Sequence, residues 1–278
     1  MEHTFHTRHD FTPDLGWAAF QLLTAFGEDG VEVDGVEQAA QVLASPLAKR
    51  ADLRKLLRSM EEIGLVRSPG NKLALTVAGV ALAGAAGRYP QGFFAGVHCL
   101  YSWMWLWGGR DAVATPSWSY RQVCRAIRAA GPLGIESDAV VLNVTGAAER
   151  FKAERVSFSR SSVNGVTGWL RAQSPPLLEP IPGRLHCPAI PRTGLTCVRF
   201  QAAALCRYGG GEANLSGEHA ELLADTLLIP TADLRRVLEE SLATGTEFHL
   251  LSNGKRIVYR SSADPFLEWI VHGQLDTQ

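Results

Sequence analysis

Hydrophobic residues recur at helical spacing over the first part of the chain. Leu15, Ala18, Ala19, Leu22 and Phe26 recur at the spacing of one helix face, which predicts an amphipathic helix that Thr12 and Pro13 open and Gly27 closes. A second helix is predicted over about 36–44, and Pro46 marks the turn that follows it.

A third helix, predicted over 48–63, separates apolar from basic positions most clearly. Its apolar face carries Leu53, Leu56, Leu57, Met60 and Ile63, and Arg50, Arg54 and Arg58 fall on another face. Gly64 is expected to end the helix. Strands at 65–66 and 73–75, with a turn near Gly70 and Asn71, then predict a β-hairpin, and Thr76 opens the next helix.

The segment from Tyr89 to Gly109 contains no Lys, Arg, Asp or Glu, and it is long enough to span a bilayer. Pro90, Gln91, His98 and Ser102 interrupt it, and its three alternating tryptophans (Trp103, Trp105 and Trp107) lie at one end. We therefore expect a buried central helix over about 90–107, with a membrane span as the alternative.

The order of three helices and a hairpin is predicted twice more. Helices near 117–127, 137–152 and 159–171 precede apolar runs at 177–181 and 184–187, although the glycines within 159–171 disfavour a helix there. Helices near 195–207, 216–227 and 231–243 precede runs at 247–251 and 255–259, between which Asn253-Gly254 predicts a type I′ hairpin. A short helix over 265–272 should bury Phe266, Trp269 and Ile270.

These elements predict a mainly α fold, built of tandem winged-helix-like units with small β-hairpins around a buried aromatic helix. The expected domains are a winged-helix domain at 1–88, a central helical, second winged-helix-like domain at 89–192, and a C-terminal helical domain with a hairpin at 193–278.

Charge is distributed unevenly along a chain whose net charge is only −1. Residues 46–72 hold seven basic and three acidic side chains, residues 110–171 hold nine and five, and residues 212–247 hold two and eight. A nucleic-acid site must therefore be a local basic patch, and the acidic C-terminal region is expected to contact a protein partner.

Candidate catalytic and metal-binding chemistry is sparse. The five cysteines are odd in number and widely spaced, and no segment is typical of a signal peptide, so we expect buried thiols, a reduced cytoplasmic setting and no disulfide framework. His3, His6 and His9 have a spacing that could hold a metal on a helix, but few other ligand types lie nearby. No G-x-S-x-G, H-E-x-x-H or D-x-D motif occurs in a convincing context. The sequence predicts a protein that is not an enzyme, with no metal and no cofactor.

Residues 12–82 resemble the winged helix-turn-helix superfamily of bacterial regulators. The resemblance rests on Leu53-Arg54-Lys55-Leu56-Leu57, on Glu61-Glu62-Ile63-Gly64-Leu65-Val66-Arg67, and on Leu75-Thr76 followed by Gly79. It implies that the helix carrying Lys49, Arg50, Arg54, Lys55 and Arg58 enters the major groove, with Lys72 as the wing contact.

A much looser likeness links the chain to an uncharacterised helical family found beside bacterial DNA-modification and anti-phage genes. It rests on Pro116-Ser117-Trp118-Ser119-Tyr120 and on Ser161-Ser162-Val163 followed by Trp169-Leu170-Arg171. It implies a part in defence or genome maintenance.

The expected function is therefore that of a non-catalytic subunit that binds DNA, with RNA as a possible ligand. Two basic surfaces are expected to make the contacts. The residues expected to contact nucleic acid are Lys49, Arg50, Arg54, Lys55, Arg58, Arg67, Lys72, Arg155, Arg160, Ser161, Asn164 and Arg171. A dimeric transcriptional regulator and a protein-docking scaffold are the alternatives, because winged helices serve both roles. The basic side chains could also be a solvated surface, and the serines near 159 could simply cap their helix.

Overall fold

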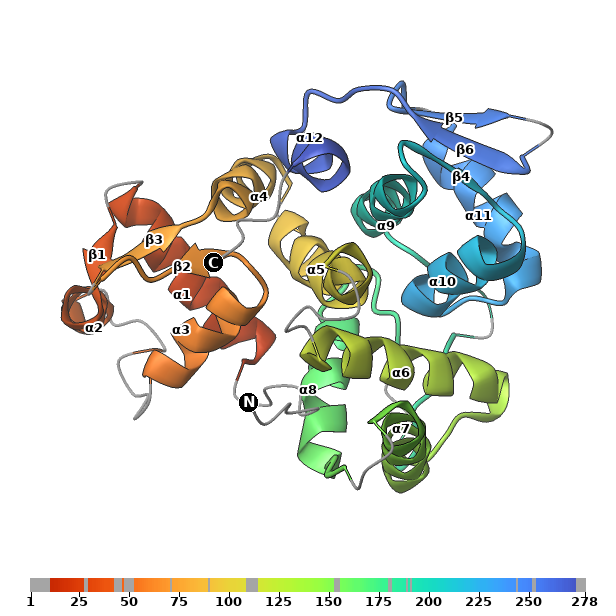
Figure 1. Ribbon diagram of the computed structural model, residues 1–278, viewed down its shortest axis with the longest axis horizontal. Coiled ribbons are helices and arrows are strands. Elements are labelled where there is room, and N and C mark those ends of the chain that lie inside the picture. Colours follow the sequence, from red (N-terminus) through yellow and green to blue (C-terminus); the bar gives the residue numbers. More distant parts are fainter. Residues whose placement is uncertain are drawn as a thin grey trace.

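A computed structural model gives the arrangement of most of the chain (Figure 1). It describes residues 11–27, 30–42, 47, 53–70, 72–89, 91–108, 115–152, 156–179, 182–188, 190, 192–243, 245–251 and 254–273. The fold is mainly helical with two small antiparallel sheets, as the sequence predicts.

The first elements form what we term the N-terminal set. They are α1 (Pro13–Phe26), β1 (Val31–Glu32), α2 (Val33–Val42), α3 (Leu53–Glu62), β2 (Val66–Arg67) and β3 (Lys72–Leu75). Strand β3 lies between the other two, in the order β1-β3-β2. The helix that follows is α4 (Val77–Arg88), whose N-cap Thr76 accepts a hydrogen bond from the Gly79 amide at 3.0 Å, as a capping residue should.

The last elements, which we term the C-terminal set, repeat this order. They are α9 (Leu195–Tyr208), β4 (Glu212–Asn214), α10 (Gly217–Leu227), α11 (Thr231–Leu242), β5 (Phe248–Leu251) and β6 (Arg256–Tyr259). The strand order β4-β6-β5 again places the last strand in the middle. Helix α12 (Pro265–His272) follows and buries Phe266, Trp269 and Ile270, as predicted.

A central set has the same order with its strands reduced to single bridges. It contains α6 (Thr115–Ala130), the short 3₁₀ helix η2 (Gly131–Leu133), α7 (Ser137–Lys152) and α8 (Arg160–Arg171). The antiparallel bridges Ile135–Leu185 and Glu179–His186 take the places of the two strand pairings. Within its described residues, the predicted hairpin at 177–187 is therefore the single bridge between Glu179 and His186.

Helix α5 (Gly92–Trp107) is the aromatic helix at the centre of the molecule. It packs against α4 and α1 on one side, α6 and α8 on another, and α9 on a third (Figure 1). Trp103 is fully buried and donates to the Gln201 side-chain oxygen at 2.5 Å. Within the described residues, none of the helices combines the length and the apolar character needed to cross a bilayer.

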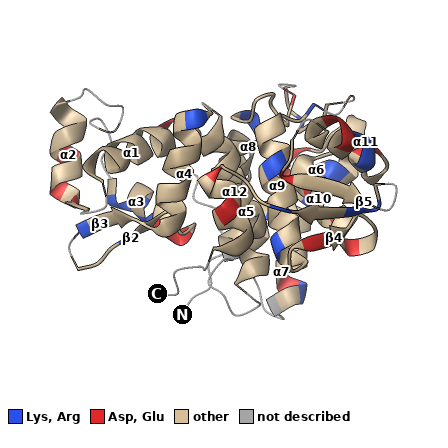
Figure 2. Ribbon diagram, turned by 90° about the horizontal axis from the view of Figure 1, so that it is seen from above, with Lys and Arg blue, Asp and Glu red and all other residues tan. Residues whose placement is uncertain are grey.

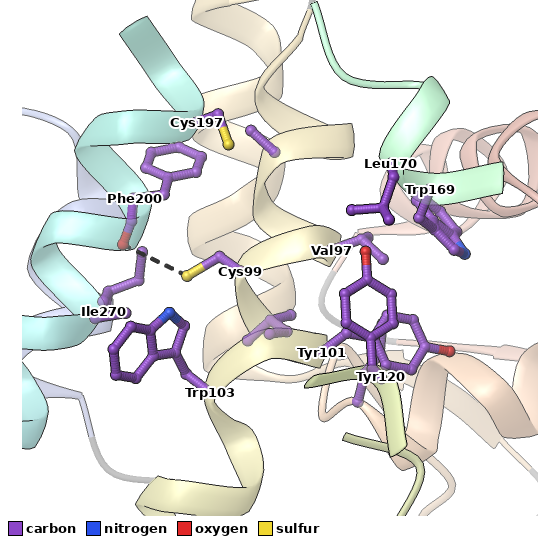
Figure 3. Close-up of a cluster of buried hydrophobic side chains, with 14 of the residues drawn as sticks. Val97, Cys99, Tyr101, Trp103, Tyr120, Trp169, Leu170, Cys197, Phe200 and Ile270 are labelled. Atoms are coloured by element: carbon purple, nitrogen blue, oxygen red, sulfur yellow. Dashed lines mark hydrogen bonds between the residues drawn. The ribbon is translucent and has the colours of Figure 1, made fainter. Parts of the chain in front are cut away.

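The buried side chains around α5 form one connected cluster that extends into all three sets. In Figure 3, Tyr101 stacks on Tyr120 of α6 with ring centroids 5.1 Å apart, and Trp169 of α8 lies close by. On the opposite side of α5, the Cys99 thiol donates to the Phe200 carbonyl of α9 at 3.5 Å. All five cysteines are buried, as expected, and burial raises the pKa of each thiol.

Candidate nucleic-acid interface

Helix α3 presents a basic surface because its apolar side chains are all turned inward. Leu53, Leu56, Leu57 and Met60 are buried against α1 and β2, at the spacing of one helix face. The exposed positions of the same helix are Arg54, Lys55 and Arg58. Lys49 and Arg50, which we expected on this face, lie outside the described residues.

The β2–β3 hairpin is held beside α3 by the residues at its base. Gly64 adopts a φ of 72°, a left-handed conformation that suits glycine after a helix, and the Leu65 amide donates back to the Met60 carbonyl at 2.9 Å. The Thr76 hydroxyl donates to the Gly64 carbonyl at 2.5 Å, which joins the start of α4 to the end of α3. The hairpin therefore extends from a fixed point next to the basic helix.

Two more of the expected contact residues lie on this hairpin. Arg67 on β2 is directly opposite Ala74, and Lys72 on β3 is directly opposite Glu32 of β1. Both basic side chains are exposed. Figure 2 shows basic residues on α3 and on the neighbouring hairpin, and Arg54 of α3 lines the same hollow as Lys72 of β3.

Most of these cations are not neutralised within the described part of the chain. Arg58 lies 3.7 Å from the Glu62 carboxylate, but its side chain is 71% exposed, and an exposed i,i+4 pair of this kind contributes little energy. Arg54, Arg67 and Lys72 form no ion pair with any described residue. Their charges are therefore free to act on a ligand.

A hollow of about 460 Å³ lies between α2, α3 and the hairpin. Two cations, Arg54 and Lys72, line it together with two carboxylates, Glu32 and Asp34. All four side chains are exposed, and none of the four is in an ion pair with another described residue. Sequence reasoning missed the two carboxylates, since only the pairing of β1 with β3 brings Glu32 next to the β2–β3 hairpin.

The second expected surface lies on α8, where one of its cations is in an ion pair. Ser161, Asn164 and Arg171 are exposed on α8, and Arg155 lies outside the described residues. Arg160 instead binds Asp138 of α7 through two hydrogen bonds, the Nε one measuring 2.9 Å, so its charge is already paired. Ser159 accepts from the Ser162 amide at 3.3 Å and caps the helix, which is the simpler role we had left open for it.

The arginines of α6 also serve the fold. Arg128 donates to Asp225 of α10 at 2.6 Å and to Glu221 of the same helix. Burial raises the pKa of the Asp225 carboxyl, and the neighbouring Arg128 limits that rise. The excess positive charge predicted for 110–171 is thus partly used to join the central and C-terminal sets.

The acidic C-terminal region is neutralised in the same way. Of its eight carboxylates, seven are in ion pairs with arginines, some of which come from outside the region. The pairs are Glu212–Arg256, Glu221–Arg128, Asp225–Arg128, Asp233–Arg236, Glu239–Arg235, Glu240–Arg236 and Glu247–Arg199. Figure 2 shows both charge types together on α11. Arginines therefore offset part of the negative charge of this region, and a protein partner at this surface stays a prediction.

The three sets differ at corresponding positions of their last strands. When the three sets are aligned by the pairing of their strands and bridges, Lys72, Arg184 and Arg256 occupy the same position. Arg184 lies 4.0 Å from Glu136 and donates to the Leu133 carbonyl at 2.8 Å, and Arg256 is paired with Glu212. Only in the N-terminal set, among the described residues, is this cation in no ion pair, although Glu32 is directly opposite it in the strand register.

No metal site accompanies this surface in the part of the chain that the structure describes. The described residues contain no group of three or more His, Cys, Asp or Glu side chains that could hold an ion. His3, His6 and His9 lie outside those residues.

Comparison with known proteins shows the fold alone. No family model matches the chain, and no curated protein matches it. The chain is similar to a solved structure described as "SspB crystal structure", with a TM-score of 0.52 and 14% sequence identity over 98% of this chain and 88% of that chain. The coverage means that the likeness includes all three sets and the central helix, rather than the N-terminal set by itself.

Proposed function

We propose that the N-terminal set is a winged helix that binds duplex DNA, and that the protein acts as a non-catalytic nucleic-acid-binding subunit. The element order α1-β1-α2-α3-β2-β3 and the strand order β1-β3-β2 agree with the resemblance described for residues 12–82. In this proposal α3 is the recognition helix and the β2–β3 hairpin is the wing.

The observation that carries the proposal is the contrast between the three sets. In the C-terminal set, Arg235 and Arg236 of α11 are paired with Glu239 and Glu240 one turn later. In the central set, α8 keeps one cation paired with Asp138. In the N-terminal set, Arg54, Arg67 and Lys72 are in no ion pair with a described residue, and the pair of Arg58 with Glu62 is longer, at 3.7 Å. These cations lie on a helix and a neighbouring hairpin, from which they could bind phosphates on both sides of a groove.

Removal of two of these cations tests the proposal. Arg58→Gln with Arg67→Gln should weaken duplex binding about tenfold or more at low salt and reduce the slope of log affinity against log salt by roughly 1.8, because each lost phosphate contact removes about 0.9. The measurement is fluorescence anisotropy of a labelled duplex across a salt series. Melting temperatures should be nearly unchanged, since both side chains are exposed.

The matched control is Arg235→Gln with Arg236→Gln, which removes the same charge from the C-terminal set. These arginines already neutralise carboxylates of their own helix. The control should therefore keep the wild-type salt slope. Equal losses in the two double variants would mean that only overall charge matters, and the interface on α3 would be rejected.

A further inference from the structure

The hollow beside α3 combines groups that phosphate does not require. Phosphate oxygens only accept hydrogen bonds, so a pure phosphate site is lined by donors. Here the cations Arg54 and Lys72 share one cavity with the carboxylates Glu32 and Asp34. A phosphate placed in the hollow would meet two like charges at close range.

The two carboxylates are not equivalent. Glu32 is directly opposite Lys72 in the β1–β3 register, although the two side chains form no ion pair. Asp34 lies in the first turn of α2 and has no cross-strand partner of this kind. Within the described lining, Arg54 supplies a guanidinium donor outside this strand pair and Asp34 supplies a carboxylate acceptor outside it.

A base-pair edge supplies the complementary pattern. In the major groove guanine presents two acceptors, O6 and N7, which suit an arginine, and its partner cytosine presents an N4 amino donor, which suits a carboxylate. An A·T pair offers the N6 donor and two acceptors but lacks the adjacent acceptor pair that an arginine binds in bidentate fashion. On the basis of the proposed function, we infer that this hollow reads a G·C base pair, with Arg54 on guanine and Asp34 on cytosine, while the cations around it bind the backbone.

The described lining of the hollow does not favour an unpaired strand. Its described lining consists of Glu32, Val33, Asp34, Arg54, Ser68, Gly70, Lys72 and Leu73, none of which is aromatic. Binding of single strands relies on aromatic side chains on which successive bases stack. The hollow therefore fits the edge of a paired base better than the face of an unpaired one.

The experiment uses the full chain and two duplexes of equal length with identical ends, one with G·C and the other with A·T pairs at the centre. Anisotropy titration of the wild type should give about a tenfold preference for the G·C duplex, the discrimination expected of a good bidentate contact. Asp34→Ala should reduce that preference to less than about twofold. Much of the change should come from tighter binding of the A·T duplex, because a charge that repels the backbone is gone.

Glu37→Ala is the matched control, because Glu37 is exposed on the same helix but does not line the hollow. It should keep the wild-type preference, and thermal melts of both variants check that α2 remains folded. A wild type that binds both duplexes equally, or an Asp34→Ala variant that keeps the preference, would overturn the inference.

The proposed function fails separately. If the wild type binds neither duplex, or if its binding is unaffected by Arg58→Gln with Arg67→Gln, the interface itself is wrong. If binding depends on Arg58 and Arg67 but shows no base-pair preference, only the role of the hollow is wrong.

Discussion

At the scale of single residues, His98 shows how much the centre of the molecule depends on one buried polar group. Its Nε2–H donates to the Thr226 carbonyl of α10 at 2.9 Å, which leaves Nδ1 to accept from the Tyr120 hydroxyl of α6 at 2.8 Å. The side chain is fully buried, and burial lowers its pKa to about 4. His98 is therefore neutral and joins three helices.

This arrangement predicts a loss of stability in mild acid. The unfolded chain takes up a proton on this histidine near pH 6.5, whereas the folded chain does so only near pH 4, so the free energy of unfolding falls as the pH is lowered through that window. The loss from this residue should total about 3 kcal/mol, since one pKa unit corresponds to about 1.4 kcal/mol. Urea unfolding between pH 7 and pH 4 measures it.

The control for this prediction is a pair of single substitutions. His98→Gln should be less stable at pH 7 but should lose most of the pH dependence in this window. His249→Gln, at a half-exposed histidine of β5, should retain it. A His98→Gln variant whose stability declines with pH as steeply as that of the wild type would assign the dependence to other groups.

Residue-level predictions succeeded where the chemistry is local. Thr76 caps α4, and the exposed face of α3 carries Arg54 and Arg58, because capping and helical spacing depend on neighbours within one or two turns. The ion pair of Arg160 with Asp138 was not foreseen, because Asp138 is on another helix and no helical spacing reveals the contact. Glu32 and Asp34 were missed for the same reason.

At the scale of elements, the start of α4 packs so closely against the base of the β2–β3 hairpin that Gly79 has no space for a side chain. A Cβ on Gly79 would lie 2.2 Å from the Leu65 carbonyl oxygen and 3.2 Å from the Leu75 Cβ. Gly87, on the same helix, would meet nothing within 4 Å. An added side chain would therefore clash at Gly79 but would have free space at Gly87, although both glycines belong to one helix.

Alanine substitutions should separate them. Gly79→Ala should destabilise the protein by about 2–4 kcal/mol, because backbone atoms must move apart. Gly87→Ala should stabilise it by about 0.5–1 kcal/mol through higher helix propensity. Chemical denaturation of both variants measures the difference, and equal effects would contradict the close approach of α4 to Leu65.

The hairpins show where turn rules failed. Asn253-Gly254 predicted a two-residue turn, but the register pairs Leu251 with Arg256 and leaves four residues between the strands. The Lys255 amide donates to the Leu251 carbonyl at 3.1 Å, which closes the longer loop. Hydrophobic pattern placed both strands, whereas register depended on the neighbouring β4, which pairs with β6 and was not predicted.

At the scale of the whole molecule, the buried side chains form one cluster rather than three. Trp169 of α8 donates to the Phe11 carbonyl ahead of α1 at 2.9 Å, so even the N-terminal and central sets share a buried contact. The boundaries predicted near 88 and 192 remain untested, but the core crosses both of them.

A shared core predicts cooperative unfolding of the entire chain. Far-ultraviolet circular dichroism and tryptophan fluorescence should report one coincident transition, although the chain is longer than most two-state proteins. Trp17 in α1 and Trp269 in α12 place fluorophores at both ends of the sequence. Separate transitions for the two signals would show that the sets fold independently.

The repeated order of helices could be predicted from the sequence because each set follows its own apolar spacing. The distribution of charge over the surface could not be predicted in this way. Arg128 and Arg199, for example, form ion pairs with carboxylates that are far away in the sequence. Only the folded arrangement reveals which cations remain available.

Helix α5 contacts elements of all three sets, which has a consequence for spacing. Because α5 packs against several elements at once, it fixes the separation between α3 and α8. If both helices meet one duplex, the interval in base pairs between their footprints is then a constant of the protein, which lengthening a surface loop would leave unaltered.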